Sequence, residues 1–316
     1  MSRELVICAP VRTAIGTYGG TLKSVPATDL GATAIRASLE RAGVEGDAVE
    51  SVVMGNVVQA GNRMNPARQA AIRGGIPVAT PALAVNRVCG SGAQAVVSAA
   101  QEVLLGHARC ALAGGLENMD RAPYLLEQAR WGYRMGDGRI VDAMLADGLH
   151  DAFSGEHAGW HTEDLVTEYG ISREEQDAGA ARSQQRFSQA QAAGAFRDEI
   201  AAVEVPGRKG TTVFDQDEHN RGDTTAESLA GLRPVFRKEG TITAGNAPGL
   251  NSGAAAMLVA ERSWAEAQGL APMGRLVAWG VGAVEPDRFG QVRLQPDASR
   301  RPVPGDKPLA VDDPQP

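Results

Sequence analysis

Apolar and polar residues alternate in blocks along the first 115 residues, and these blocks predict strands that alternate with helices. Strands are expected at residues 5–9, 51–56, 82–86 and 110–113, and helices at 29–42, 66–73 and immediately after residue 89. The strand segments LVICA, SVVMGN and CALAGG are apolar without strict alternation, which is typical of strands covered on both faces. The rhythm predicts an α/β fold with helices packed on a largely parallel sheet.

The pattern loosens between residues 121 and 245, where glycine breaks, a polar helix expected at 172–191 and the charged loop DQDEHNRGDTT interrupt it. This composition predicts an inserted, loop-rich module. Residues 246–270 return to a glycine-rich turn, an apolar strand and a helix, and a second strand is expected at 274–279. Residues 291–316 are rich in proline and lack apolar periodicity, so we expect a disordered tail there.

Composition narrows the class of protein. With 316 residues and 43% hydrophobic content, the chain can bury a large core, and its length suggests two domains. The net charge is −7 and the lysines and arginines are scattered singly, so we expect no face that binds nucleic acid or an anionic membrane. No run of eighteen apolar residues occurs, and the N-terminus enters a strand without a signal-peptide pattern. We therefore expect a cytoplasmic protein that acts on small molecules.

Three cysteines occur, at spacings that match neither a zinc site nor a redox CxxC pair. Cys8 and Cys110 lie inside apolar strand segments, where we expect them to pack in the core. Cys89 differs, because a Gly-Ser-Gly turn and an apolar helix follow it directly. The positive end of a helix stabilises a thiolate, so this position favours a nucleophile; the alternative is a small buried cysteine. Five apolar residues at helical spacing are expected to anchor this helix: Ala93, Val96, Val97, Ala100 and Leu104.

Several long segments are similar to those of one enzyme family and occur in the same order. The segment NRVCGSGAQAV at residues 86–96 resembles the active-site signature of the thiolases. Four further segments resemble thiolase motifs: ICAPVRTAIGTYGG at 7–20, GGLENMDRAPY at 114–124, DGLHDAFSGEHAG at 147–159 and LRPVFRKEGTITAGNAPGLNSGAAAMLV at 232–259. The resemblance extends to about Gly290.

The resemblance implies a thiolase-like α/β fold, with an N-terminal half that contains an inserted CoA-binding loop domain and with an incomplete C-terminal half. The implied divisions are an N-terminal half at 1–120, the loop domain at 121–245, a return to the N-terminal half at 246–270, a stub of the C-terminal half at 271–290 and a tail at 291–316. The segment YLLEQARWGYRMGDG is similar to the one that family members use for tetramer contacts. A homodimer or homotetramer is therefore expected.

The resemblance also implies which residues would take part in acyl transfer and in CoA binding. Cys89 would be the nucleophile that takes an acyl group from coenzyme A as a thioester, with its own backbone N–H as one oxyanion donor. Pro248 stands where thiolases commonly have serine, so CoA is expected to bind more weakly, or through Asn246 and backbone carbonyls. CoA thioesters are substrates in this scheme, and no separate cofactor is expected. The positions that match the family's CoA contacts are Leu149, His157, Arg221, Ser228, Phe236 and Ala244.

A metal site is the alternative for one pair of histidines. His157 and His161 are four residues apart, which is the spacing of two metal ligands on one helix face. No third ligand follows at a recognisable spacing, and the resemblance already accounts for His157. We therefore expect no metal site.

Part of the family's machinery has no counterpart in the sequence. Claisen chemistry needs a base for the thiol, a group that moves the α-proton and a second oxyanion donor. In the family these come from GHP, CxGGG and NEAF motifs, none of which occurs here. The resemblance stops after Gly290, and a segment rich in proline and arginine follows. We hypothesise a frameshift, and the alternative is a genuinely short protein; in both cases we expect impaired turnover and an exposed apolar face on the helix after Cys89.

The sequence and its resemblance to the thiolases are consistent with three functions. The first is a thiolase-type acyl-CoA acyltransferase of fatty acid metabolism that, in complete form, makes or cleaves acetoacetyl-CoA or another 3-ketoacyl-CoA. The second is a non-catalytic subunit that binds acyl-CoA or assembles with an intact partner. A ketosynthase-like condensing enzyme is a more remote alternative, because the CoA-loop motifs argue against it.

The frameshift hypothesis predicts the content of the coding DNA. Sequencing from the codon of Glu285 through the stop codon and beyond is expected to reveal NEAF, GHP and CxGGG motifs in another reading frame. A single uninterrupted frame with no thiolase remnant downstream would instead favour the genuinely short protein.

Overall fold

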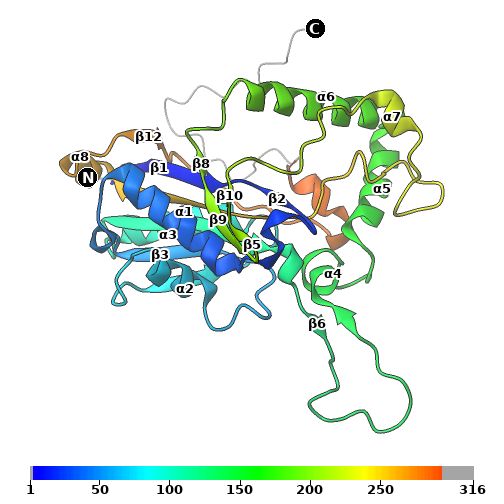
Figure 1. Cartoon of the computed structure of the whole chain (residues 1–316), viewed down its shortest axis with the longest axis horizontal. Helices are drawn as coiled ribbons and strands as arrows, with labels where there is room; N and C mark the ends of the chain where they lie inside the picture. Colours follow the sequence, from blue (N-terminus) through cyan, green and yellow to red (C-terminus); the bar gives the residue numbers. More distant parts are fainter. Residues whose placement is uncertain (1–2, 294–316) are drawn as a thin grey trace.

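A mixed sheet forms the centre of the protein in the computed structural model, which describes residues 3–293. Its strand order is β12-β1-β11-β5-β3-β4, with β2 paired to β11 and β8 paired to β1. Figure 1 labels β1, β2, β3, β5, β8 and β12 of this sheet. The strands are β1 (Leu5–Thr13), β2 (Gly16–Thr17), β3 (Ser51–Gly55), β4 (Ala82–Val85), β5 (Cys110–Asn118), β8 (Ile200–Ala201), β11 (Asn251–Glu261) and β12 (Pro272–Arg275).

Helices cover both faces of this sheet. Helices α1 (Ala27–Ala42) and α2 (Pro66–Arg73) pack on one face, and α3 (Ser91–Leu105) packs on the other. Successive strand residues point to opposite faces, so Val52 joins the core under α1 whereas Val53 joins the core under α3. The prediction that the apolar strands are covered on both faces is confirmed.

The prediction of a largely parallel sheet is wrong. Strands β3, β4 and β5 are parallel neighbours, as their helical connections require. Strand β11 lies between β1 and β5 and runs antiparallel to both, and β12 runs antiparallel to β1. The rhythm of the first 115 residues reports only local strand–helix–strand connections, whereas β11 arrives from residues 251–261.

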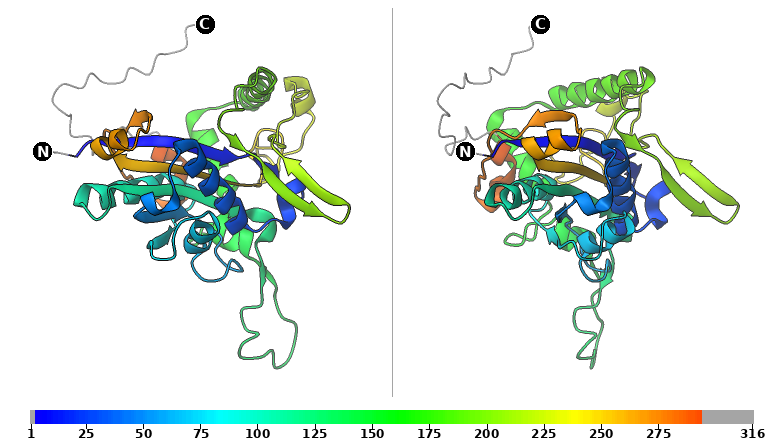
Figure 2. Two further views of the ribbon diagram at one scale, coloured as in Figure 1. Left: turned by 60° about the vertical axis from the view of Figure 1, so that its left-hand side comes forward. Right: turned by 90° about the vertical axis from the view of Figure 1, so that its left-hand side faces the viewer.

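The inserted segment builds an arm and a layer of helices. Strands β6 (Tyr124–Leu125) and β7 (Val141–Asp142) pair at the base of a long arm that projects from the body (Figure 2). The remaining elements are α4 (Ala143–Gly148), α5 (Ala158–Tyr169), α6 (Arg173–Ala192), β9 (Val203–Gly207), β10 (Gly210–Phe214) and α7 (Ala226–Ala230). Strand β8 and the inner side of the β9–β10 hairpin join the main sheet and its core. The limits 121–245 for this module remain a proposal.

The chain after β11 differs from the prediction in two places. Helix α8 (Arg262–Ala267) leads into β12, which ends at Arg275, so the strand expected at 274–279 is shorter and starts earlier. Among the described residues, β12 forms the sheet edge and pairs only with β1. The 3-10 helix Pro286–Arg293 includes the first three residues of the predicted tail, and the rest of that tail lies outside the described residues. Three other 3-10 helices are Thr21–Ser24, Gly46–Ala48 and Met119–Arg121.

The centre of the sheet predicts where a cavity is most costly. Leu112 is fully buried on β5, between β11 and β3. Leu112→Ala is expected to lower the free energy of unfolding by about 2–5 kcal/mol, because it removes buried apolar atoms and leaves a cavity. Leu105 is 70% exposed, so Leu105→Ala is the matched control, with an expected change within about 0.5 kcal/mol. Urea denaturation measures both, and equal midpoints would contradict the packing described.

Candidate active site

Cys89 lies on the turn between β4 and α3, and its side chain is exposed. The alternative of a small buried cysteine is therefore wrong. Gly90 caps α3 without a side-chain hydrogen bond, so the positive end of the helix is open beside the thiol. The preceding residue, Val88, has a φ of 46°, which a β-branched side chain rarely adopts.

Side-chain hydrogen bonds hold Val88 in this conformation. The Val88 N–H donates to Asn86 Oδ1 at 2.8 Å, and the Val88 carbonyl accepts from Ser91 Oγ at 2.6 Å. Ser91 Oγ in turn accepts from the Arg87 N–H at 2.8 Å. Strained backbone persists only where neighbouring contacts determine it, so these bonds fix the direction in which the thiol points.

The first turn of α3 rests directly on the end of β3. A Cβ atom on Gly55 would lie 2.6 Å from the carbonyl carbon of Ser91 and 2.8 Å from the nitrogen of Gly92. Any side chain at residue 55 would therefore displace the turn that carries Cys89. The glycine lets the helix approach the sheet at the carboxyl end of a parallel strand, where α/β proteins place their sites.

The face that anchors α3 differs from the predicted one. Ala100 is buried as expected, but Ala93 and Leu104 are exposed, and Val96 and Val97 are only half-buried. The buried face consists of Ala95, Ala99, Ala100 and Val103. Apart from a polar stripe of Gln94, Ser98, Gln101 and Glu102, most of the circumference of α3 is apolar, so its hydrophobic pattern does not select one anchoring face, and the small alanines allow the closest approach to the sheet.

A half-buried carboxylate that the sequence pattern did not indicate ties this turn to the loop after β3. Glu117 accepts hydrogen bonds from Asn56 Nδ2 at 3.0 Å and from the N–H groups of Val57 and Val58 at 2.8 and 3.3 Å. Burial raises the pKa of Glu117, and these hydrogen bonds oppose the rise. The Val57 carbonyl accepts from Asn86 Nδ2 at 3.3 Å. The available signal was a single acidic residue inside the apolar strand segment CALAGGLEN.

Three of the predicted CoA-contact residues lie together next to this loop. His157 caps α5, and its ring stacks on Phe236 with ring centroids 4.6 Å apart. The Leu149 carbonyl accepts from the Ala158 N–H at 2.8 Å, directly after His157. A Cβ built on Gly148 would lie 3.6 Å from Cγ2 of Val58, so the residue before Leu149 lies close to the loop that Glu117 holds.

The protonation of His157 follows from its contacts. Burial lowers its pKa, and neighbouring His150 lowers it further. Its Nδ1 accepts from the Gly159 N–H at 2.9 Å, so the proton of the neutral ring is on Nε2. At neutral pH, His157 is therefore a hydrogen-bond donor without charge.

Two other predicted residues lie on the surface of the inserted segment. The Arg221 side chain is exposed, and its backbone N–H donates to Gln184 Oε1 at 2.9 Å. Ser228 lies in the first turn of α7, where its hydroxyl donates to the Thr225 carbonyl at 2.8 Å and accepts from the Thr225 N–H at 3.1 Å. Within residues 3–293, no hydrogen bond joins either residue to the His157–Phe236 pair.

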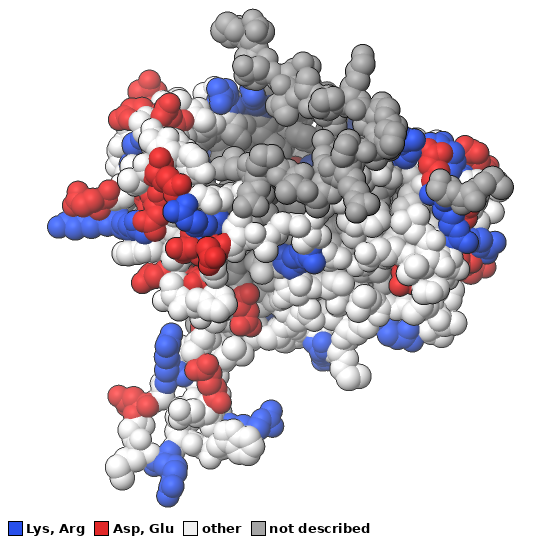
Figure 3. Space-filling view, turned by 180° about the vertical axis from the view of Figure 1, so that it is seen from behind, with Lys and Arg blue, Asp and Glu red and all other residues white. Residues whose placement is uncertain are grey.

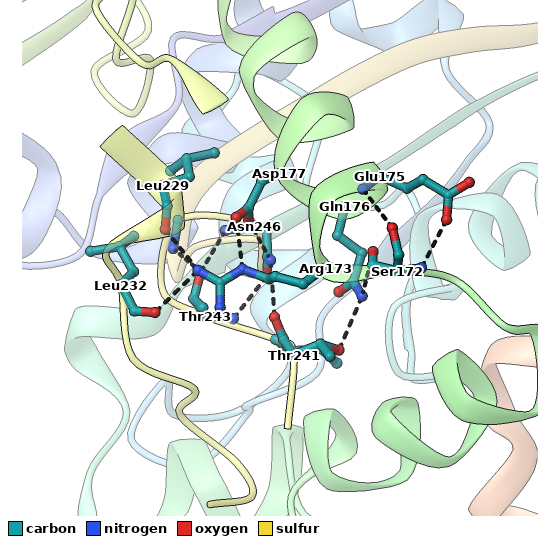
Figure 4. Close-up of polar contacts among 12 residues, drawn as sticks. Ser172, Arg173, Glu175, Gln176, Asp177, Leu229, Leu232, Thr241, Thr243 and Asn246 are labelled. Carbon is teal, nitrogen blue, oxygen red and sulfur yellow. Dashed lines mark hydrogen bonds and ion pairs between the residues drawn. The ribbon is translucent and has the colours of Figure 1, made fainter. Parts of the chain in front are cut away.

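Ala244 and Pro248 are exposed. They lie on a turn whose geometry depends on Asn246, whose contacts with Asp177, Thr241 and Thr243 are drawn in Figure 4. Asn246 Oδ1 accepts from the Thr243 N–H at 2.8 Å, and its Nδ2 donates to Asp177 Oδ1 at 2.8 Å and to the Thr241 carbonyl at 3.2 Å. Both amide hydrogens of Asn246 are thus engaged within the protein. This arrangement argues against Asn246 as the substitute CoA ligand.

The two histidines considered for a metal make separate contacts. His161 is buried and its Nε2 lies 2.8 Å from Ser154 Oγ, whereas Nδ1 of His157 faces a backbone N–H. In the part of the chain that the structure describes, no group of three or more histidine, cysteine, aspartate or glutamate side chains is placed to hold a metal ion.

The surface gives no sign of a nucleic-acid site on the face that Figure 3 shows. Positive and negative side chains are interspersed there, without a basic patch among the described residues. Between residues 3 and 293, no helix is both long and apolar enough to span a bilayer.

Comparison with known proteins gives a consistent result. A family model described as the N-terminal domain of thiolase matches residues 5–263. The beta-ketothiolase BktB of Cupriavidus necator is 52% identical over 292 residues, which cover 92% of this chain and 74% of that protein. An acetyl-CoA acetyltransferase of Escherichia coli is 49% identical over 289 residues, covering 91% and 73%.

A solved structure agrees with these relatives. The crystal structure of the Bacillus anthracis acetyl-CoA acetyltransferase superposes with a TM-score of 0.88 at 40% identity, covering 90% of this chain and 72% of that one. The chain therefore spans about three quarters of the length of the proteins that it matches.

The difference in exposure among the three thiols predicts that a thiol reagent modifies one of them selectively. Burial raises the pKa of Cys110 to about 12, with Cys8 and Glu50 adding to the rise, so that thiol stays protonated at neutral pH. Cys8 is buried as well, whereas Cys89 is exposed. Iodoacetamide is expected to modify only Cys89 in the folded chain and all 3 cysteines after denaturation. Peptide mass spectrometry measures this, and equal rates at the three sites in the folded chain would contradict the structure.

Proposed function

Because the chain belongs to the thiolase family, we propose that it is an acyl-CoA acyltransferase in which Cys89 accepts the acyl group. The observation that carries this proposal is the exposed Cys89 thiol at the open N-terminus of α3, on a strained turn held by side-chain hydrogen bonds. A thiol at such a position is accessible to a thioester and lies at the positive end of a helix, which suits a nucleophile in covalent catalysis.

The proposed step is acyl transfer from a CoA thioester to Cys89. The Sγ thiolate attacks the thioester carbonyl carbon and forms a new C–S bond, and the tetrahedral intermediate expels CoA as a thiolate that takes up a proton. The backbone N–H of Cys89 is the proposed donor to the oxyanion. In the described part of the chain, no histidine hydrogen-bonds the Cys89 thiol, so we expect acylation without an internal base and impaired turnover.

The proposed substrate path runs from the thiol to the cluster around His157. The contacts from Asn86 to Val57 and from Val58 to Gly148 support one continuous wall between the nucleophile turn and that cluster. Leu149 and Phe236 would line the pantetheine chain, and the Nε2–H of His157 would donate to a pantetheine amide carbonyl. An uncharged donor suits an amide better than a cation would, because no charge has to be buried.

The nucleotide end of CoA is proposed to meet the outer residues. Arg221 supplies an exposed cation for a phosphate group. Ser228 has its donor and one lone pair engaged in the cap of α7, so it could only accept a hydrogen bond from the ligand. Ala244 and Pro248 would contact the ligand through their backbone and apolar surface, and Pro248 offers neither a hydroxyl nor an N–H. Weaker CoA binding than with serine at this position is the expected result.

A second candidate function is an acyl-CoA-binding or assembly subunit, and exposed apolar residues favour it. Trp131 is 84% exposed and Met135 is 98% exposed on the projecting arm. Large exposed apolar side chains mark protein contacts, and a homodimer or homotetramer is the proposed assembly. We place the protein in the cytoplasm in either case, with CoA thioesters as substrate or ligand and no separate cofactor.

Acyl-enzyme formation separates the two candidates. Incubation with acetyl-CoA is expected to add one acetyl group to the peptide that contains Cys89, and Cys89→Ser is expected to abolish the label. Mass spectrometry of the digested protein reads this directly, with the buried Cys8 and Cys110 as internal controls. CoA affinity without any label would instead support the binding subunit.

A further inference from the structure

An ion pair on α6 makes hydrogen bonds to the two segments that carry the outer CoA-contact residues. Asp177 is only 3% exposed, and its Oδ2 lies 2.7 Å from Nε of Arg173 one turn earlier. A carboxylate this well buried requires a full set of partners, whereas the Arg173 side chain is partly exposed. Figure 4 shows that the remaining partners come from two other segments of the chain.

Arg173 holds the end of α7. Its Nη2 donates to the carbonyls of Leu229 and Leu232 at 2.7 and 3.1 Å. A cation at a helix C-terminus satisfies carbonyls that lack an intrahelical partner and interacts favourably with the helix dipole. The position of α7, and therefore of Ser228 on it, depends on this guanidinium.

Asp177 holds the turn that contains Ala244. Its second oxygen, Oδ1, accepts from Asn246 at 2.8 Å, and Asn246 in turn bonds the backbone on both sides of residue 242. The turn also packs against α7, since a Cβ on Gly245 would lie 2.4 Å from a methyl carbon of Leu229. The ion pair thus joins both segments to α6 at one point.

The start of the same turn is held independently, by α5. The carboxylate of Glu163 accepts from the Thr241 N–H at 3.0 Å and from the Ile242 N–H at 2.9 Å. Loss of the Asp177 contact would therefore release the middle of the turn while its start stays fixed. A local displacement of Ala244 to Pro248 is expected, without unfolding of the module.

We infer that Arg173 and Asp177 are positioning residues for acyl-CoA, which set the relative position of the α7 segment and the 243–248 turn without touching the ligand. The inference rests on the proposed function. A role in stability alone does not account for the geometry, because a buried ion pair contributes little net stability compared with apolar residues of similar size. The pair instead links the α7 segment and the 243–248 turn, the two segments that are proposed to contact the ligand and that are not adjacent in the sequence.

The test measures how Cys89 acetylation depends on acetyl-CoA concentration. Asp177→Asn keeps one oxygen for Asn246 but turns an amide N–H toward Arg173, so the ion pair is lost. We expect the half-saturating acetyl-CoA concentration to rise roughly tenfold or more, with the limiting acetylation rate unchanged. Glu174→Gln makes the same charge change at an exposed position on α6 and is expected to leave both quantities unchanged.

A substitution that acts by unfolding the chain would change different measured quantities. Partial unfolding would lower the fraction of chain that can be labelled at saturation, and it would change the iodoacetamide rate at Cys89, which does not depend on CoA binding. The double substitution Arg173→Met with Asp177→Leu removes both charges and keeps an apolar core. It is expected to fold and to show the same raised half-saturation as Asp177→Asn.

Affinity for free CoA, measured by calorimetry on the same variants, separates the inference from the proposed function. A wild-type chain that binds CoA but takes no acetyl group overturns acyl transfer, while a weaker affinity in Asp177→Asn still supports positioning. Unchanged half-saturation and unchanged CoA affinity in a folded Asp177→Asn or double variant overturn the inference. A wild-type chain that shows neither binding nor labelling overturns both.

Discussion

The pairing of β11 with β1 and β5 is the constraint on which the arrangement of the molecule depends. The ladder runs from Ser252 opposite Asn118 to Ala260 opposite Cys110, and the other edge of β11 pairs with β1. These hydrogen bonds offset the entropy of closing the long segment between β5 and β11. Strand β11 is buried in the middle of the sheet. The chain that leads into it, which includes the 243–248 turn, is therefore held close to the sheet that carries Cys89.

Short polar contacts connect the sheet to the loops that surround the site. Glu117 at the end of β5 fixes the loop after β3, and that loop contacts both the Cys89 turn and the start of the His157 cluster. Asp177 and Glu163 then fix the turn beyond it. Asp177 and Glu163 are buried and Glu117 is half-buried, and both oxygens of each carboxylate accept from N–H groups, so fixed acceptors rather than surface charges shape the site.

The sequence allowed the longer strands of the central sheet and the helices packed on it to be predicted, because their apolar pattern is local, whereas the short elements of the inserted segment were not predicted apart from α6. It did not reveal β11 between β1 and β5, since the partners of a strand lie far away in the chain. The strand expected at 110–113 continues as β5 to Asn118, and glycine leaves room there for the backbone of β11: a Cβ on Gly114 would lie 2.1 Å from the Ala255 carbonyl oxygen. The turn and helix after Cys89 favour a nucleophile, and the resemblance to the thiolases implies that role, whereas nothing in the sequence distinguishes Asp177 from the other charges of a polar helix.

The histidine cap of α5 makes this part of the protein sensitive to acid. His157 has a lowered pKa in the folded chain, so the unfolded chain binds a proton at this side chain more readily. The stability it contributes is present above the ordinary histidine value of 6.5 and is lost as the pH falls through the lowered folded value. Protonation of Nδ1 would remove the acceptor for the Gly159 N–H, so mild acid would uncap α5 and loosen the wall next to Phe236.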